Sequence, residues 1–143
     1  MKRTLKQLIR LGRQQLDEKR REQAALFAQI DQLMADEAGL QQGLAREQAA
    51  ASADPVAGMA FAAYAQSVRD RRARLDQRRA ELDRQAADKA EEIRDAFEDV
   101  KRYEIMLERK EADAKAERDR LEQANLDEIG LNRHTSAAPG AAN

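Results

Sequence analysis

Ser52-Ala53-Asp54-Pro55 is the stretch that decides how this chain folds. Aspartate is a favoured residue at a helix start, because its carboxylate accepts a free backbone N–H of the first turn. Proline suits the first helical position, whereas in the interior of one continuous helix it costs about 3 kcal/mol. The stretch therefore predicts a turn over about residues 51–54, with one helix on each side.

The composition on both sides of this turn favours helices. Of the 143 residues, 37% are charged and only 3% are aromatic, and the chain has no Cys and no Trp. Ala, Leu, Glu, Lys, Arg and Gln are strong helix formers, and a chain rich in them is typical of long helices or coiled coils. Disorder is the alternative for so polar a sequence, but sustained heptad repeats argue against it.

Apolar residues recur with the alternating three- and four-residue spacing of a coiled-coil seam. Before the turn the seam includes Leu5, Ile9, Leu16, Leu26, Ile30, Leu33, Leu40 and Leu44. After it the seam includes Phe61, Val68, Leu75, Leu82, Ala86, Ile93, Val100, Leu107 and Leu121. Polar residues interrupt the seam, among them Lys19 before the turn and Lys89 after it. The expected fold is all-α: a two-helix antiparallel coiled-coil hairpin with an overhanging C-terminal helix.

The boundaries follow from the caps and the repeats. Helix one is expected over about 4–50 and helix two over about 55–131, ending at Gly130 and Asn132, which favour left-handed backbone near a C-cap. Together they form one predicted domain over 1–133, followed by a disordered tail over 134–143. Folding back at the turn pairs Leu5 with Val100 and Gly12 with Ile93.

Two charge blocks support the same folding back. The arginines between 69 and 79 face Asp31, Asp36 and Glu37, and the acids between 88 and 99 face Lys6, Arg10 and Arg13. Because a wrong register sets like charges together, such pairs fix orientation and register.

The two helices differ in length, and this mismatch carries the functional argument. Helix one is exhausted near Tyr103, so roughly 28 further residues extend on the order of 40 Å without a partner. A lone helix is poorly stabilised, and an exposed apolar stripe marks an interaction site. We therefore expect this overhang to dock on another protein. The alternative is a self-associated coiled coil, such as a parallel dimer.

The sequence also argues against several classes of function. The net charge of −1 does not favour nucleic acid. His134 is the only histidine and there is no cysteine, so no zinc ligand set exists. No phosphate loop or nucleophile constellation is present, and a two-helix coiled coil offers no cleft for acid–base catalysis. We expect no enzymatic activity, no cofactor and no metal. Without a membrane-spanning run or a signal-peptide core, we expect a cytoplasmic protein.

The last third of the chain carries a resemblance to a known family. The residues are Tyr103-Glu-Ile-Met-Leu-Glu-Arg-Lys110, then Glu122-Gln-Ala-Asn-Leu-Asp-Glu-Ile129, and finally Arg133-His134. This pattern resembles the C-terminal signature of the flagellar export protein FliJ family. The plan of a shorter helix, a turn and a longer helix is similar too.

The resemblance implies a cytoplasmic stalk of the flagellar type III export apparatus, peripheral to the cytoplasmic face of the inner membrane. Its implied partners are the export ATPase hexamer, the cytosolic domain of the export-gate membrane protein, and export chaperones. The ATPase-facing end would contain Leu5, Leu8, Tyr103, Met106, Leu107, Leu121 and Ile129. The gate-facing surface near the hairpin tip would contain Leu40, Leu44, Phe61, Tyr64 and Val68.

Several alternatives remain open at this point. The nearest is the equivalent stalk of a virulence type III secretion system, and a self-associating structural coiled coil is another. Leu107, Leu121 and Ile129 would then pack against a second copy. The arginine block over 69–79 would suit RNA or acidic lipid, but pairing with helix one explains it more simply. The basic start over 2–13 would suit a membrane surface, and pairing with the acidic block explains it equally well.

Overall fold

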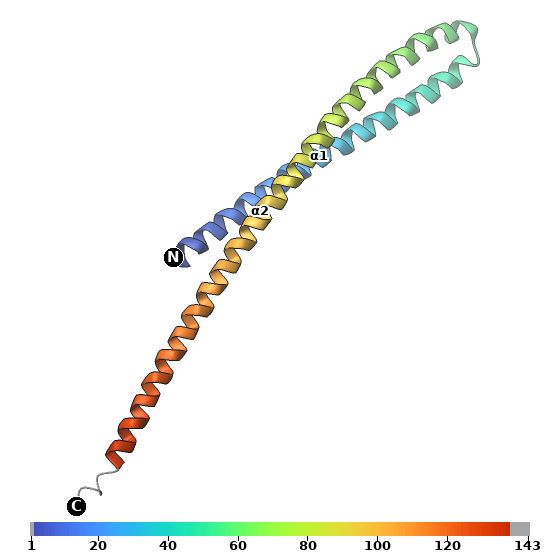
Figure 1. The fold of residues 1–143 in the computed structure, drawn as a ribbon. Helices are drawn as coiled ribbons and strands as arrows, with labels where there is room; N and C mark the ends of the chain where they lie inside the picture. The colour runs from blue at the N-terminus through green and yellow to red at the C-terminus, as the bar shows by residue number, and fades with distance from the viewer. Residues whose placement is uncertain (1, 138–143) are drawn as a thin grey trace, which may run out of the picture. The chain divides into compact units, whose positions relative to one another are not determined.

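The computed structural model describes residues 2–137, and these residues form two helices. Helix α1 spans Lys2–Ala51 and helix α2 spans Pro55–Ala137 (Figure 1). No described residue lies in a strand. The predicted class, an all-α helical hairpin, is confirmed.

The turn between the helices forms where the sequence places it. The carboxylate of Asp54 accepts a hydrogen bond from the backbone N–H of Val56 at 3.1 Å, and the Asp54 carbonyl accepts one from the Gly58 N–H at 3.2 Å. On the other side, the hydroxyl of Ser52 donates to the Gln48 carbonyl at 3.0 Å. Side chains thus satisfy backbone groups that two helix ends leave without partners.

The end of α2 differs from the prediction. The helix continues past Leu131 to Ala137, so the prediction of a disordered tail is wrong for residues 134–137, and its remainder, 138–143, lies outside the described residues. Gly130 has no positive φ, and the Thr135 hydroxyl donates to the Leu131 carbonyl at 2.9 Å. Glycine costs a helix only about 1 kcal/mol, which does not end it unless a competing turn forms.

Contacts along the chain group its described part into two units. One unit is the hairpin over 14–97, and the other joins the start of α1 to α2 from residue 98 onward. The first has Leu16, Val68, Leu82 and Ala86 as its buried core, and the second buries Leu5, Ile9 and Val100. All seven lie on the predicted seams. The single coiled-coil domain over 1–133 stays a prediction.

The register differs from the expected one by one heptad. A Cβ built on Gly12 would lie 2.8 Å from a methyl group of Val100, not against Ile93. Arg13 correspondingly bonds Glu104 at 2.7 Å, beyond the predicted acidic block. Because a heptad shift returns every seam residue to a seam position, the apolar pattern fits both registers. The observed one brings Lys89 to Glu22, whereas the predicted one sets Lys89 opposite Leu16.

Two glycines in α1 give a matched test of this packing. Replacing Gly39 by Ala is expected to stabilise the chain by about 1 kcal/mol, because helix propensity improves and open space surrounds the new methyl group. The same change at Gly12 is expected to gain little, because Val100 has to move. Urea unfolding of both variants measures the difference. Equal gains at the two positions would contradict the close approach at Gly12.

Candidate interaction surfaces

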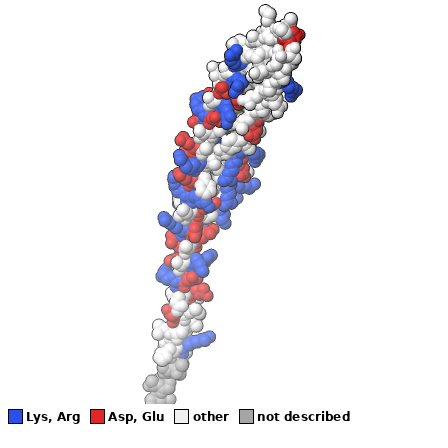
Figure 2. All heavy atoms as spheres, turned by 90° about the vertical axis from the view of Figure 1, so that its right-hand side faces the viewer, with Lys and Arg blue, Asp and Glu red and all other residues white. Residues whose placement is uncertain are grey.

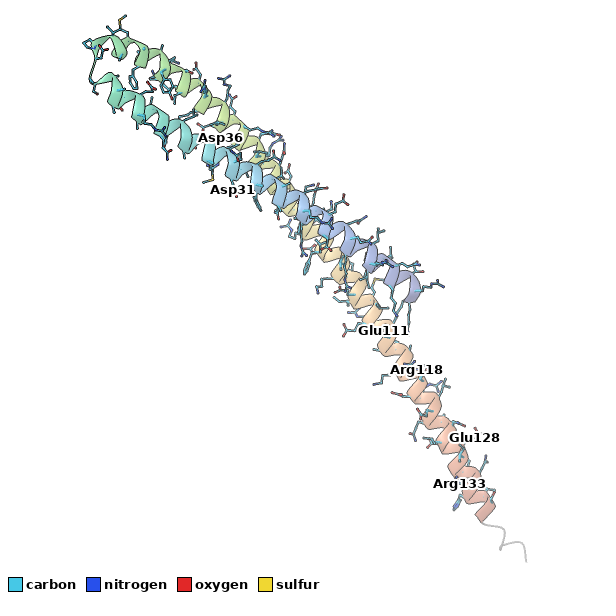
Figure 3. All side chains as sticks on the ribbon, turned by 180° about the vertical axis from the view of Figure 1, so that it is seen from behind. Asp31, Asp36, Glu111, Arg118, Glu128 and Arg133 are labelled. Carbon is cyan, nitrogen blue, oxygen red and sulfur yellow. The ribbon has the colours of Figure 1, made fainter. Side chains whose placement is uncertain are left out.

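The C-terminal part of α2 has no packing partner among the described residues. Every residue from 115 to 136 is exposed, including Leu121 and Leu126, each at 54%. Figure 3 shows Arg118, Glu128 and Arg133 projecting from this bare stretch of helix. We call residues 115–136 the free segment. It begins further along α2 than the predicted Tyr103, because the register is shifted by one heptad.

The residues predicted to face an ATPase ring fall into three groups in the structure. Leu5 is buried in the core, so it presents no surface for a partner. Tyr103 and Leu107 are half-buried. The exposed ones are Leu8, Met106, Leu121 and Ile129. Only Leu121 and Ile129 lie on the free segment, so they are the best remaining candidates for a partner contact.

The residues predicted to face the export gate are mostly part of the hairpin seam. Val68 is 1% exposed and belongs to the core. The other four, Leu40, Leu44, Phe61 and Tyr64, are half-buried. The Tyr64 hydroxyl lies 2.7 Å from where a Cβ on Gly43 would be, so Tyr64 covers the opposite helix.

Two exposed apolar residues at the tip were missed by sequence reasoning. Val56 is 76% exposed and Met59 is 81% exposed. Between Gln48 and Val68 the only charged residue is Asp54, and this charge-poor run is the signal that identifies them. Figure 2 shows the result on one face: uncharged surface gathers at the turn, and mixed charges cover the rest of the hairpin.

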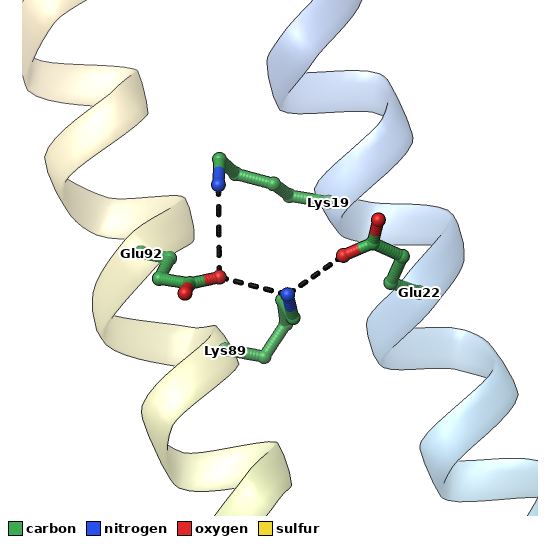
Figure 4. A network of polar contacts seen from close by, with 4 residues as sticks. All are labelled: Lys19, Glu22, Lys89 and Glu92. Atoms are coloured by element: carbon green, nitrogen blue, oxygen red, sulfur yellow. Dashed lines mark hydrogen bonds and ion pairs between the residues drawn. The ribbon is translucent and has the colours of Figure 1, made fainter.

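A network of four charged residues joins the helices within the hairpin (Figure 4). The Lys89 ammonium contacts Glu22 at 2.6 Å and Glu92 at 2.8 Å, and Lys19 contacts Glu92 at 3.6 Å. The hydrogen bond that Lys89 donates to Glu22, followed by the one that it donates to Glu92, raises the pKa of Lys89. The hydrogen bond from Lys89, followed by the charge of Lys19, lowers the pKa of Glu92. Both lysines occupy seam positions, so the network satisfies charges that interrupt the apolar stripe.

This network predicts a stability that falls at both pH extremes. A lowered Glu92 pKa adds stability above its ordinary value of 4.5, and this is lost as pH falls through the folded value. A raised Lys89 pKa adds stability below 10.5, and this is lost as pH rises beyond it. The urea concentration at which half of the protein is unfolded, measured from pH 3 to 11, should therefore be highest and nearly constant between about pH 5 and 10. Lys89→Met should lower the plateau and flatten both limbs, and an unchanged profile would contradict the network.

Comparison of the chain with protein-family models, with curated proteins and with solved structures found no match in any of the three. No described helix is long and apolar enough to cross a membrane. Among the described residues, no group of three or more His, Cys, Asp or Glu side chains is placed to hold a metal ion. The described residues offer the exposed free segment, the apolar tip and hollows between the helices as surfaces for contact.

Proposed function

We propose that this chain is a non-enzymatic stalk of the flagellar type III protein export apparatus. In this role it couples the export ATPase ring to the membrane export gate and escorts export chaperones, at the cytoplasmic face of the inner membrane. Its chemistry is burial of apolar surface and pairing of charges, with no bond made or broken. The same interactions would serve a virulence secretion stalk, and the ATPase that it binds distinguishes the two systems.

The observation that carries the proposal is the free segment. It is helical, exposed on all sides, and contains the residues from Glu122 to Ile129 that resemble the FliJ signature. Leu121 and Ile129 project from one side of the helix, because eight residues are slightly more than two turns. Apolar side chains that have no partner within the chain are suited to burial against another protein.

The test is binding of the purified chain to the flagellar export ATPase of its own organism. Leu121→Asp/Ile129→Asp should weaken binding about 30-fold or more, because two anchors of an interface each contribute at least about 1 kcal/mol. Both positions are exposed, so helicity by circular dichroism should not change. Leu107, which is half-buried, is left intact so that folding and binding are not confused.

A matched control adds the same two charges on the other side of α2, at one residue on the free segment and one just before it. Ala112→Asp/Ala116→Asp should retain wild-type affinity, because these exposed alanines lie away from Leu121 and Ile129 on the helix. If the wild-type chain does not bind the ATPase ring, the stalk function fails. If both double variants lose binding equally, the contact is electrostatic and the apolar interface is not its basis.

A further inference from the structure

A groove runs between α1 and α2 on one face of the hairpin. Nearer the turn, it widens to a hollow of about 540 Å³. The apolar walls of this hollow are Leu40 and Leu75, and its charged rim is Asp36, Arg71 and Arg74. Gly39 also lines it, and nothing lies within 4 Å of the position where a Cβ on Gly39 would be. The hollow is thus open to a side chain from outside.

A second hollow of about 420 Å³ lies on the same face, further from the turn. Its lining residues repeat those of the first hollow at positions two heptads away: Leu26 for Leu40, Glu22 for Asp36, Asp88 for Arg74, and Lys89 for Leu75. Two heptads return a coiled coil to the same face and advance it by about 21 Å. The two hollows are therefore parts of one groove.

The two ends of the groove carry opposite charge. Arg71 and Arg74 outnumber Asp36 at the hollow nearer the turn, and neither arginine makes an ion pair with any described residue. At the other hollow the three acids Glu22, Asp88 and Glu92 outnumber the two lysines, Lys89 in its lining and Lys19, which contacts Glu92. An amphipathic helix is expected to lie in this groove with its acidic end at the two arginines.

The free segment has the matching pattern. Lys115 and Arg118 lie toward its beginning and Glu128 toward its end, with Leu121 exposed between them. Lys115 and Glu128 are about 20 Å apart along the helix, which is close to the separation of the hollows. Arg118 and Glu128 project from the bare helix in Figure 3 and make no ion pair within the described chain.

We propose that the groove of one copy binds residues 115–131 of α2 from a second copy, as a third helix. Glu128 then meets Arg71 and Arg74, and Lys115 with Arg118 meets the acidic hollow. Leu121 and Ile129 become buried over the apolar walls of the groove. Amphipathic helices commonly recognise such grooves through one apolar face. The inference does not depend on the proposed function. Leu121 and Ile129 cannot, however, contact the groove of a second copy and the proposed export ATPase at the same time.

The contact joins two different surfaces, so each bound copy still has one groove or one free segment to offer. Association of this kind extends beyond a dimer unless a ring closes. Sedimentation equilibrium of the full chain should therefore show a mean mass that rises with concentration above that of the monomer. The rise should shrink in high salt, because exposed charges are screened. A monomer at every concentration would overturn the proposal.

Charge reversal on each side provides the sharper test. Arg71→Glu/Arg74→Glu reverses the groove, and Asn125→Lys/Glu128→Lys reverses the free segment. Each variant alone should associate at least about tenfold more weakly than the wild type, because like charges then face each other. Mixing the two variants should restore association, since each reversed surface then meets a complementary one. Circular dichroism confirms that each variant remains helical.

A charge-matched control identifies the face. Arg69→Glu/Arg94→Glu makes the same change in net charge at exposed arginines that do not line the groove, and it should associate like the wild type. Loss of association in the free-segment variant but not in the groove variant would mean that free segments pair with each other. That outcome, equal loss in the control, or failure of the mixture to restore association would overturn the proposal.

Discussion

Leu82→Asp is expected to unfold the hairpin under conditions in which the wild type is folded. Leu82 is 1% exposed and, with Val68, is one of the two most deeply buried large side chains. The substitution removes an apolar side chain from the core and places a carboxylate where it has no partner. The combined loss should be about 4 kcal/mol or more, which is a large part of the stability of a small domain.

Two companion variants separate the causes of this loss. Leu82→Ala should cost about 2–4 kcal/mol through the lost burial alone. Ala87→Asp adds the same charge at an exposed position on the same helix and should cost less than about 1 kcal/mol. Urea unfolding followed by circular dichroism measures all three. If Leu82→Asp and Ala87→Asp were equally stable, the burial of Leu82 in the hairpin core would be wrong.

Removing residues 115–143 is expected to abolish ATPase binding while the hairpin stays folded. The described part of this stretch is exposed throughout, so its removal takes almost no buried apolar surface from the core. The unfolding free energy should change by less than about 1 kcal/mol, because exposed positions away from packing contribute little. The affinity for the export ATPase should fall about 30-fold or more, since both exposed anchors are lost together.

The opposite pattern would be equally informative. If the shortened chain bound the ATPase as tightly as the full chain, the interface would lie on the hairpin or at its tip. If the shortened chain were much less stable, the free segment would contribute packing in solution. A chain ending at Gly130 is a useful comparison, because it keeps Leu121 and Ile129 and should bind like the full chain.

Local sequence signals predicted the turn and the seams well. Asp54 and Pro55 act through their own backbone and side-chain chemistry. The turn therefore depends only on a few residues that are adjacent in the sequence. The seam residues follow a periodicity that few alternatives share, and the buried residues lie on it. In contrast, the helix end at Gly130 was predicted from a residue preference of about 1 kcal/mol, which the surrounding helix overrides.

The register could not be predicted from the apolar pattern. Shifting one helix by seven residues leaves apolar residues facing each other in most layers, so the choice depends on a few polar positions. Lys19 and Lys89 are those positions, because each needs a carboxylate from the opposite helix. The one-heptad shift in register also moves the candidate interaction surface along α2. Leu107 is half-buried, and the free segment begins near Lys115.

The groove charges were partly visible in the sequence. The arginine block over 69–79 was expected to pair with acids on helix one, and Arg72 does pair with Glu37 at 3.4 Å. Arg71 and Arg74 point to the groove instead. The register and the angular position around α2 decide which arginines of the block face the partner helix. The composition of the block specifies neither the register nor that angle.

The turn at Asp54 also determines how the chain is expected to fold. Pairs that cross between the helices join residues separated by 35 positions for Arg72 and Glu37, 49 for Arg78 and Gln29, and 67 for Lys89 and Glu22. The pair of Arg13 and Glu104 is separated by 91. Each pair that forms near the turn shortens the loop that the next pair must close. The entropic cost of each loop closure is therefore small. Folding should proceed by zippering away from residues 52–54, and substitutions near the turn should slow folding more than equally destabilising ones near Leu5.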